Sequence, residues 1–440
     1  MRTVGGTQVI STLDRSVAPQ GLRVRLTRWT EKPGIRTALV AVLALRLTTS
    51  ACAALAVIVL HDRYLRAVNT AYATASSLHV FVVPPPLHGL AEYLTGPWMR
   101  WDANYYCDIA FRGYVQERST AFLPLYPGSI RLGATITGGD VVAAGMLIST
   151  VATFACFVSL YRLTERLTGS TAAARMSVVS ACLLPVAFFL MAPYTEALFL
   201  ALSLAAILAA LDRRWRRASI LAALASLTRQ QGVLLAVLAL PELWSITHRA
   251  WSAGGVVRHR AWRWAHHSWQ PLLVVVAPPL ALGAWLLFLK AVAHQPTPAE
   301  LLTGSNGWRQ HFTLPGLGDV SMVRILLANP ADVLLHHVDI PLDTGAAIAA
   351  AWGLFAARKR LPVGLLLYLT LSWCASVAKV TEIETTPSAS RYLLALLPLC
   401  LLPGIWLARA EPVVRFAVMI PCWIVAAWLF LNWILWGWVA

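Results

Sequence analysis

The residues best suited to chemistry lie in one stretch, from Trp98 to Pro127, of an otherwise apolar chain. The sequence WMRWDANYYCDIAFRGY is followed, after a short polar gap, by AFLPLYP. It places Asp102 and Asp108 close to the aromatic pair Tyr105 and Tyr106. A carboxylate can act as a general base toward a hydroxyl group. The stretch therefore predicts a site for a reaction at an acceptor hydroxyl.

The composition places this stretch in a polytopic membrane protein. Of the 440 residues, 58% are hydrophobic and 13% are charged, and 19 are Trp. These values depart from the soluble average in the direction of several apolar segments of spanning length. We expect an all-α fold. The seven cysteines are scattered, which gives no disulfide framework and no metal cluster.

The net charge of +16 could suggest a nucleic-acid partner, but its distribution favours a membrane protein. Arg and Lys collect in the cytoplasmic loops of such proteins. The basic run from Arg249 to His267 carries interleaved Trp, and we interpret it as a cytoplasmic loop on the leaflet. The expected partner is membrane lipid and no nucleic acid.

Apolar segments and their flanking charges predict about 11 transmembrane helices. Residues 1–33 form a basic tail, which places the amino terminus in the cytoplasm. Residues 34–440 form a single transmembrane domain of the cell membrane. Within it, 61–138 is a long external loop with the site, and 294–331 is a second external loop. The active site is therefore expected to be extracytoplasmic.

Two segments depart from simple crossings. Residues 121–137 are apolar but short and interrupted by prolines, so they fit an amphipathic helix in the interface, and a full crossing stays open. Residues 218–247 lie between two basic runs and must cross an even number of times. Two short legs that turn at residues 228–232 satisfy this requirement and place Arg229 near the external surface.

Several charged residues fall on the external face of this topology. A charge at the membrane boundary is costly, so a functional role is the default expectation. The set comprises Asp102, Asp108, Glu196, Arg229, Lys379, Glu382, Glu384 and Arg391. Carboxylates in a loop together with cations at helix ends suit a substrate with a polar reacting group and an anionic lipid. A polyprenyl phosphate sugar has that shape.

The corresponding chemistry is displacement of the lipid phosphate by an acceptor hydroxyl. One carboxylate acts as general base, and arginine suits the leaving phosphate through its bidentate fork. A single displacement inverts the anomeric configuration. The acceptor could be a glycolipid, a polysaccharide or a protein.

Five segments together resemble a known family. They are WDANYYCDIAFRGY, AFLPLYP, PVAFFLMAPYTEALF, LTRQQG and SRYLLALLP. Their order is similar to that in PIG-V-like mannosyltransferases, which use dolichol phosphate mannose to add the second mannose in glycosylphosphatidylinositol (GPI) anchor synthesis. The resemblance covers residues 95–400 and implies a GT-C glycosyltransferase fold. It also implies mannose as the sugar, no metal or other cofactor, and an actinobacterial type of member.

The resemblance also assigns roles to individual residues. Asp102 matches the catalytic acidic position, and Tyr105 and Tyr106 match its aromatic pair. Glu196 matches the acidic residue of the YTE turn, and Arg391 matches a basic residue near the lipid phosphate. The expected catalytic residue is thus Asp102. The expected substrate-binding residues are Arg100, Tyr105, Tyr106, Asp108, Glu196, Arg229, Lys379 and Arg391.

Simpler structural interpretations compete with these roles. Asp102 could pair with Arg100 or Arg112, Glu196 could cap its helix, and Arg391 could reach toward the interface from a helix end. A structural role is favoured for Asp108. The spacing of His336, His337, Asp339 and Asp343 could suit a metal, but adjacent histidines point to different faces of a helix.

Two other classes of function compete with a transferase. A transporter or flippase would show inverted repeats and broken helices that meet at the midplane, and the sequence has no such internal symmetry. A non-catalytic membrane subunit would tolerate replacement of Asp102. The concentration of polar residues on one face favours the transferase.

Overall fold

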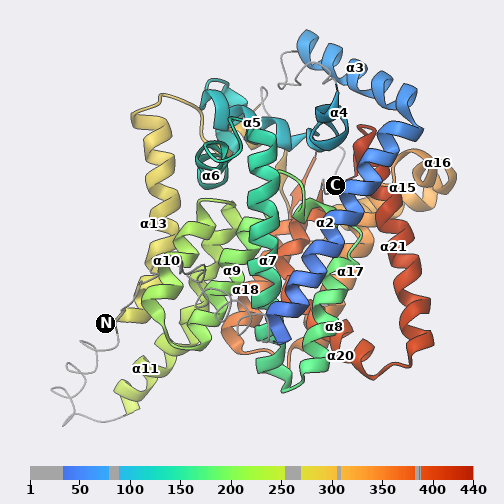
Figure 1. The fold of residues 1–440 in the computed structure, drawn as a ribbon. Helices are drawn as coiled ribbons and strands as arrows, with labels where there is room; N and C mark the ends of the chain where they lie inside the picture. Colours follow the sequence, from blue (N-terminus) through green and yellow to red (C-terminus); the bar gives the residue numbers. More distant parts are fainter. Residues whose placement is uncertain are drawn as a thin grey trace, which may run out of the picture.

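The computed structural model describes residues 33–78, 89–252, 269–304, 309–381, 386 and 388–439, and these form a helical protein (Figure 1). The expected all-α fold is confirmed. Almost all of the basic tail, together with Glu382 and Glu384, lies outside the described residues.

Within the described residues, six helical segments are long and apolar enough to cross a membrane. They are α2 (Pro33–Val59), α7 (Val141–Thr168), α13 (Gln270–Ala291), α17 (Asp339–Ala357), the segment Ala389–Arg409 and α21 (Pro412–Ile434). Two shorter apolar helices are α9 (Glu196–Leu211) and α18 (Val363–Val377). The protein is therefore a multi-pass membrane protein, and the count of about 11 crossings stays a prediction.

Local sequence explains where these helices begin and end. Helix α7 begins after Asp140, whose carboxylate accepts hydrogen bonds from the backbone N–H groups of Val142 and Ala143. It ends at Gly169, which has a φ of 66° in the left-handed region that favours glycine. The run of 28 residues between these two caps is more than long enough to span a bilayer, which requires about 20 residues.

The segment that was expected to cross as two short legs does contain two helical legs. They are α10 (Trp215–Ser226) and the 3-10 helix η4 (Gln230–Ala239), which continues into α11 (Leu240–Ser252). A Cβ on Gly232 would lie 2.3 Å from the backbone nitrogen of Ser226, so only glycine permits the close approach of the legs after the turn.

Several crossings are interrupted. Helix α8 (Thr171–Cys182) is followed by the 3-10 helix η3 (Ala187–Leu190). The segment Ala389–Arg409 consists of α19 (Ala389–Tyr392), the 3-10 helix η6 (Leu393–Cys400) and α20 (Leu401–Arg409). Such breaks free backbone groups and side chains to face a cavity.

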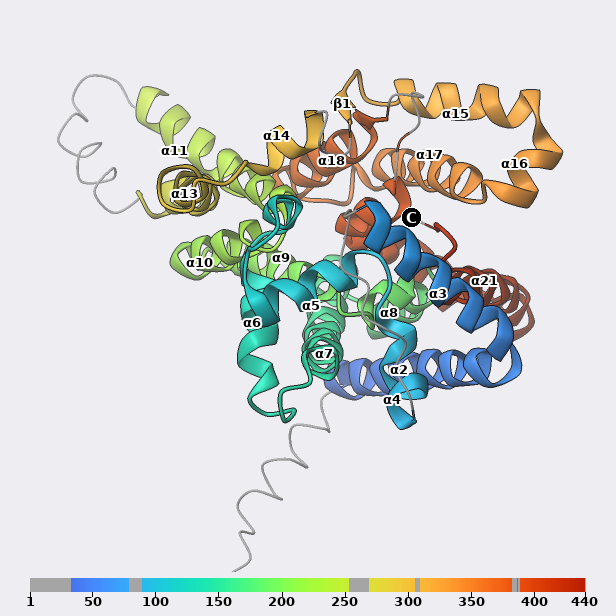
Figure 2. The same cartoon turned by 90° about the horizontal axis from the view of Figure 1, so that it is seen from above.

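One end of the long helices is covered by short elements (Figures 1 and 2). From the first predicted loop these are α3 (His61–Leu78), α4 (Leu90–Leu94), η1 (Gly96–Trp98), α5 (Asp102–Arg112), η2 (Glu117–Ala121) and α6 (Leu125–Ala134). Helix α6 has 10 residues. At 1.5 Å per residue it is about 15 Å long, half of what a bilayer core requires. This length favours the interfacial interpretation of residues 121–137.

The second predicted loop covers the same end. It contains α14 (Pro298–Thr303), β1 (His311–Phe312), α15 (Leu317–Ala328) and α16 (Pro330–His336). Strand β1 pairs antiparallel with β2 (Lys379–Val380), with Phe312 opposite Lys379. This pairing fixes the position of Lys379 relative to the helices.

Candidate active site

The predicted base lies at a strained point of the backbone. Asp102 is the first residue of α5, and the preceding Trp101 has φ 50° and ψ −119°. A non-glycine residue in this region costs free energy and persists only when its surroundings hold it. The ring of Trp101 makes edge contacts with Trp436 at 5.4 Å and Trp438 at 5.0 Å between centroids. These contacts hold the start of α5.

A cavity of about 350 Å³ opens beside Asp102, and we name it the charged cavity. Its walls come from α5, the start of α9, the turn before η4, β1, β2 and α19. The charged residues that line it are Asp102, Glu196, Arg229, Lys379 and Arg391. Three cations face two carboxylates, so the lining has a net charge of +1 and favours an anionic ligand.

Arginine 391 joins the two carboxylates of the charged cavity. Its Nη1 lies 2.8 Å from Oδ2 of Asp102, and its Nε lies 3.3 Å from Oε1 of Glu196. Glu196 also forms an ion pair with Arg229. Arg391 and Glu196 are buried, whereas a quarter of the Asp102 side chain is exposed. Asp102 is therefore the more accessible of the two carboxylates.

The three cations also surround one phenol ring. Lys379 donates from Nζ to the hydroxyl of Tyr392 at 3.0 Å and lies 4.2 Å from its ring centroid. The guanidinium carbons of Arg229 and Arg391 lie 5.0 Å and 5.3 Å from the same centroid. Tyr392 thereby holds the cations close together, at distances where cation–π attraction offsets part of their repulsion.

Neighbouring polar groups position this cationic wall. The buried carboxylate of Asp343 accepts a hydrogen bond of 2.7 Å from the backbone N–H of Ser390, next to Arg391. Gln231 donates to Ser376 on α18 at 2.9 Å, which ties the turn after Arg229 to that helix. Asp343 thus orients the short helix α19 through its backbone.

The aromatic pair divides between two roles. Tyr106 lines the charged cavity, and its hydroxyl lies 3.3 Å from Oγ1 of Thr195. Burial raises the pKa of Tyr106, and the carboxylates of Asp102 and Glu196 raise it further. Its hydroxyl therefore stays protonated and can donate. Tyr105 stacks on Phe122 at 4.6 Å and does not line the cavity.

Two further predicted binding residues also lie outside the cavity lining. Arg100 is buried and donates to the backbone carbonyls of Ile434, Gly96 and Met99 at 2.7 to 2.9 Å. Asp108 pairs with Arg112, four residues on, at 2.5 Å. Both residues hold the backbone or the helix around the site, the structural role that the sequence favoured for Asp108.

Some lining residues escaped the sequence analysis. They are Phe122, Gln230, Gln231, Gln310, Phe312, Tyr392 and Trp438. Helix α21 ends at Ile434, and Trp438 beyond it reaches the cavity. Tyr392, Gln230, Gln231 and Phe122 lie within the quoted motifs SRYLLALLP, LTRQQG and AFLPLYP, and this membership was the available signal.

Comparisons with known proteins agree with the motifs. The model of the family described as "Mannosyltransferase (PIG-V)" matches residues 49–260, which include Asp102, Glu196 and Arg229. "GPI mannosyltransferase 2" of Schizosaccharomyces pombe is 31% identical over 121 residues, which cover 27% of this chain and 26% of the relative. "GPI alpha-1,6-mannosyltransferase 2" of Cricetulus griseus is 32% identical over 127 residues, with the same two coverages.

The chain thus matches about a quarter of the length of these curated relatives. No solved structure matches it. Lys379 and Arg391 lie beyond the matched residues, so the family comparison covers the carboxylates of the cavity and only part of its cations. Over residues 49–260 the chain is thus similar to the PIG-V mannosyltransferase family.

Proposed function

We propose that this protein transfers a mannosyl residue from a polyprenyl phosphate donor to an acceptor hydroxyl. The observation that carries the proposal is the placement of an accessible carboxylate and three cations around one cavity in a membrane protein whose residues 49–260 match the mannosyltransferase family model. The carboxylate deprotonates the acceptor hydroxyl, and the cations bind the donor phosphate. A non-catalytic subunit would not need this arrangement, and a transporter would show inverted repeats, which the sequence lacks.

Asp102 is the proposed base because Glu196 is already engaged. Glu196 lies against two arginines, Arg229 and Arg391, and is buried, so proton uptake there would break two ion pairs. Asp102 contacts one of these arginines and is partly exposed to the cavity. A base needs access to the hydroxyl that it deprotonates. The role of Glu196 is to hold the two arginines in place.

Arg391, Arg229 and Lys379 form the proposed phosphate site. A phosphate oxygen accepts charge-assisted hydrogen bonds from guanidinium and ammonium groups, and arginine can offer two donors at once. With three cations on one side of the cavity, the leaving phosphate can be stabilised without a metal ion.

The proposed reaction is a single displacement at the anomeric carbon. The acceptor O–H gives its proton to the Asp102 carboxylate while the acceptor oxygen forms a bond to that carbon. The bond between the carbon and the phosphate oxygen breaks, and the electron pair leaves with the polyprenyl phosphate. Attack opposite the leaving group inverts the anomeric configuration.

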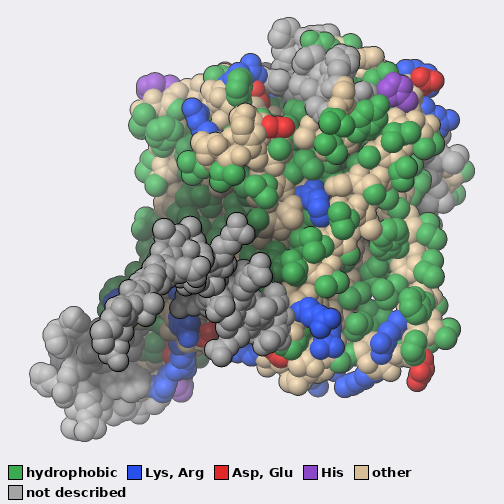
Figure 3. Space-filling model, viewed as in Figure 1, with side chains coloured by type: hydrophobic (Ala, Val, Ile, Leu, Met, Phe, Trp, Pro, Cys, Tyr) green, Lys and Arg blue, Asp and Glu red, His purple; other side chains and the backbone are tan. Residues whose placement is uncertain are grey.

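The donor and acceptor determine where the protein works. A polyprenyl chain stays in the bilayer while its phosphate reaches the end of the helix bundle that carries the cavity. We propose that this end is extracytoplasmic and that the amino terminus is cytoplasmic, because basic residues gather at the opposite end (Figure 3). The acceptor classes are a glycolipid, a polysaccharide and a protein, with a glycolipid favoured by the family.

The experiment is a transfer assay with purified protein in nanodiscs, radiolabelled polyprenyl phosphate mannose and a membrane glycolipid extract. Asp102→Asn keeps the shape of the side chain and removes its basicity. We expect kcat to fall by about a hundredfold or more, the usual contribution of a general base, with little change in the donor KM.

The matched control is Asp108→Asn, another carboxylate of α5 that pairs with Arg112 outside the cavity. It should transfer at a rate close to wild type. Equal transfer by wild type and Asp102→Asn would remove Asp102 as the base. A wild-type protein that transfers no sugar from any polyprenyl phosphate donor would refute the proposed function.

A further inference from the structure

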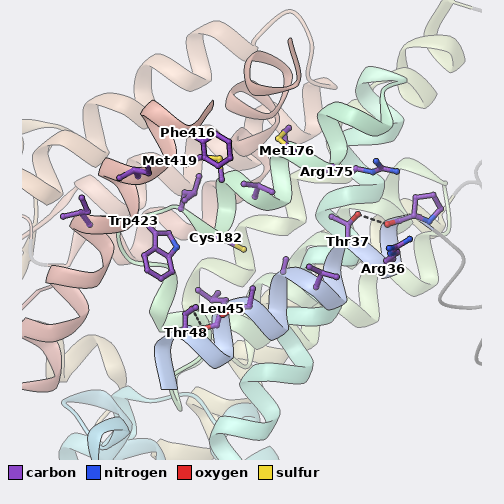
Figure 4. A pocket seen from close by; sticks show the side chains of 18 residues that line it. Arg36, Thr37, Leu45, Thr48, Arg175, Met176, Cys182, Phe416, Met419 and Trp423 are labelled. Atoms are coloured by element: carbon purple, nitrogen blue, oxygen red, sulfur yellow. Dashed lines mark hydrogen bonds between the residues drawn. The ribbon is translucent and has the colours of Figure 1, made fainter. Parts of the chain in front are cut away.

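A second cavity lies far from the charged one, between α2, α8 and α21. It has a volume of about 910 Å³ and is shown in Figure 4. We name it the α2–α21 cleft. That volume is at the upper end of what small-molecule sites enclose. Its lining includes Val40, Leu45, Met176, Val179, Phe416 and Ile420.

The hydroxyl groups in this lining already have partners. Thr37 donates to the backbone carbonyl of Pro33 at 2.8 Å, and Thr48 donates to that of Ala44 at 2.7 Å, both within α2 (Figure 4). Threonines bonded in this way leave their methyl groups as contact surface. The cleft is therefore apolar over most of its length and suits hydrocarbon chains.

The charge in the cleft is confined to one end. Figure 4 shows Arg36 and Arg175 close together there, away from Phe416 and Trp423. Both arginines are exposed, and neither forms a salt bridge with another residue in the part of the chain that the structure describes. Two guanidinium groups at the mouth of an apolar cleft complement an anionic headgroup with hydrocarbon chains.

Helix α21 forms the loosely packed side of this cleft. Its buried residues are Leu429, Phe430, Trp433 and Ile434, all in its last two turns. The part of α21 before these turns contributes Phe416, Met419, Ile420 and Trp423 to the cleft. A helix that packs at one end only leaves its other half to be covered by whatever fills the gap.

We propose that the α2–α21 cleft binds an anionic phospholipid, with Arg36 and Arg175 holding the phosphate and the acyl chains between α2 and α21. The lipid comes from the leaflet on the side where basic residues gather (Figure 3). It is distinct from the donor, whose phosphate site is the charged cavity at the other end of the bundle.

Such a lipid would be coupled to the charged cavity through α21. The carbonyl of Ile434, at the end of this helix, accepts a hydrogen bond of 2.7 Å from Nε of Arg100. Arg100 lies two residues before Asp102. Trp433 packs against Trp98 with centroids 6.3 Å apart, and Trp438 lines the charged cavity. Bracing the free half of α21 therefore stabilises the elements that place the proposed base.

Native mass spectrometry of the full-length protein tests the proposal, with phosphatidylglycerol and phosphatidylcholine of identical acyl chains as probes. Wild type should bind one phosphatidylglycerol at least about tenfold more tightly than phosphatidylcholine, because phosphatidylglycerol keeps a net negative charge for the two guanidinium groups, whereas the choline ammonium neutralises the other headgroup. The double variant Arg36→Gln/Arg175→Gln should lose this preference. Its affinity for phosphatidylcholine should fall by a smaller factor than its affinity for phosphatidylglycerol.

The control variant is Arg216→Gln/Arg217→Gln, which removes two exposed arginines from the start of α10. It has the same change in net charge and should keep the preference. Ala44→Trp places a bulky ring in the cleft and should weaken both lipids alike. Thermal unfolding of each variant without added lipid shows whether it is folded.

Four results would overturn the proposal. Equal affinities for the two lipids in wild type would remove the headgroup contact, and so would a preference that survives in Arg36→Gln/Arg175→Gln. Displacement of phosphatidylglycerol by an equimolar polyprenyl phosphate would assign the cleft to the donor chain. Lipid binding that appears only after deletion of residues 1–31 would show that the protein's own amino-terminal segment occupies the cleft.

Discussion

The charged cavity has a carboxylate wall, formed by Asp102 and Glu196, and a cation wall, formed by Arg229, Lys379 and Arg391. The two walls are built from different kinds of backbone segment. The carboxylates, Asp102 and Glu196, are each the first residue of a helix, where the helix dipole favours a negative charge. The cations come from a turn, a two-residue strand and a four-residue helix, which carry Arg229, Lys379 and Arg391. The reacting side of the cavity is thus held by regular helices, and the donor side by irregular segments.

This difference explains how one cavity can serve both the acceptor and the polyprenyl phosphate donor. A base must be held precisely relative to the hydroxyl that it activates, and helices of the scaffold give that precision. A lipid phosphate enters and leaves, and contacts from several short segments can adjust to it. The family model also matches the two carboxylates and Arg229, whereas Lys379 and Arg391 lie beyond it.

The largest effect in this comparison is expected at Arg391, the residue that joins the walls. Arg391→Gln removes the cation that lies 2.8 Å from Asp102 and 3.3 Å from Glu196. It also removes charge stabilisation from the leaving phosphate, so we expect kcat to fall about 100- to 1,000-fold and the donor KM to rise. Steady-state transfer kinetics with varied donor measure both.

Arg391→Lys is the matched variant for the same position. It keeps the charge but loses the planar fork that reaches both carboxylates, so it should recover only part of the rate. A variant with lysine as active as wild type would mean that charge alone matters there. If Arg391→Gln kept wild-type kinetics, the contacts of Arg391 with the two carboxylates and with the phosphate would contribute nothing to transfer.

Much of this cavity could be predicted from sequence because charges are conspicuous in an apolar chain. Asp102, Glu196, Arg229, Lys379 and Arg391 come from five separate segments, and all of them line the same cavity. Charge bias across the loops was enough to place them at one end of the bundle. A charge at the membrane boundary is costly and therefore indicates a functional role. Here the five charges line one cavity, which indicates a common role.

For residues adjacent to these charges, the sequence could not predict which of them line the cavity. Arg100 lies two positions from Asp102, yet its guanidinium donates to the carbonyl of Ile434, which is remote in sequence. Tyr105 and Tyr106 are adjacent, and helix geometry directs only Tyr106 into the cavity. Trp438 lies beyond the end of α21, and its sequence position gives no sign that it lines the cavity. Long-range packing decided each of these cases.

A smaller effect is expected at Lys379, which touches only the cation wall. Lys379→Gln removes one of three positive charges without disturbing either carboxylate. We expect the donor KM to rise about tenfold, the loss of one charge-assisted contact, with kcat reduced less. The contrast with Asp102→Asn, which should lower kcat and spare the donor KM, separates the walls by kinetics alone. A fall in kcat equal to that of Asp102→Asn would erase the distinction.

The smallest effect is expected at Tyr392, which organises the cations without carrying a charge of its own in the reaction. Tyr392→Phe keeps the ring that lies under Arg229 and Arg391 and removes the hydroxyl that accepts from Lys379. Because a single hydrogen bond contributes about 0.5–1.5 kcal/mol, the donor KM should rise only a few-fold. Combining Tyr392→Phe with Lys379→Gln should add little beyond Lys379→Gln alone, since both remove the same contact. Fully additive effects in that double variant would show that Tyr392 acts on the donor independently of Lys379. Tyr392 would then not act by positioning the cations of the cation wall.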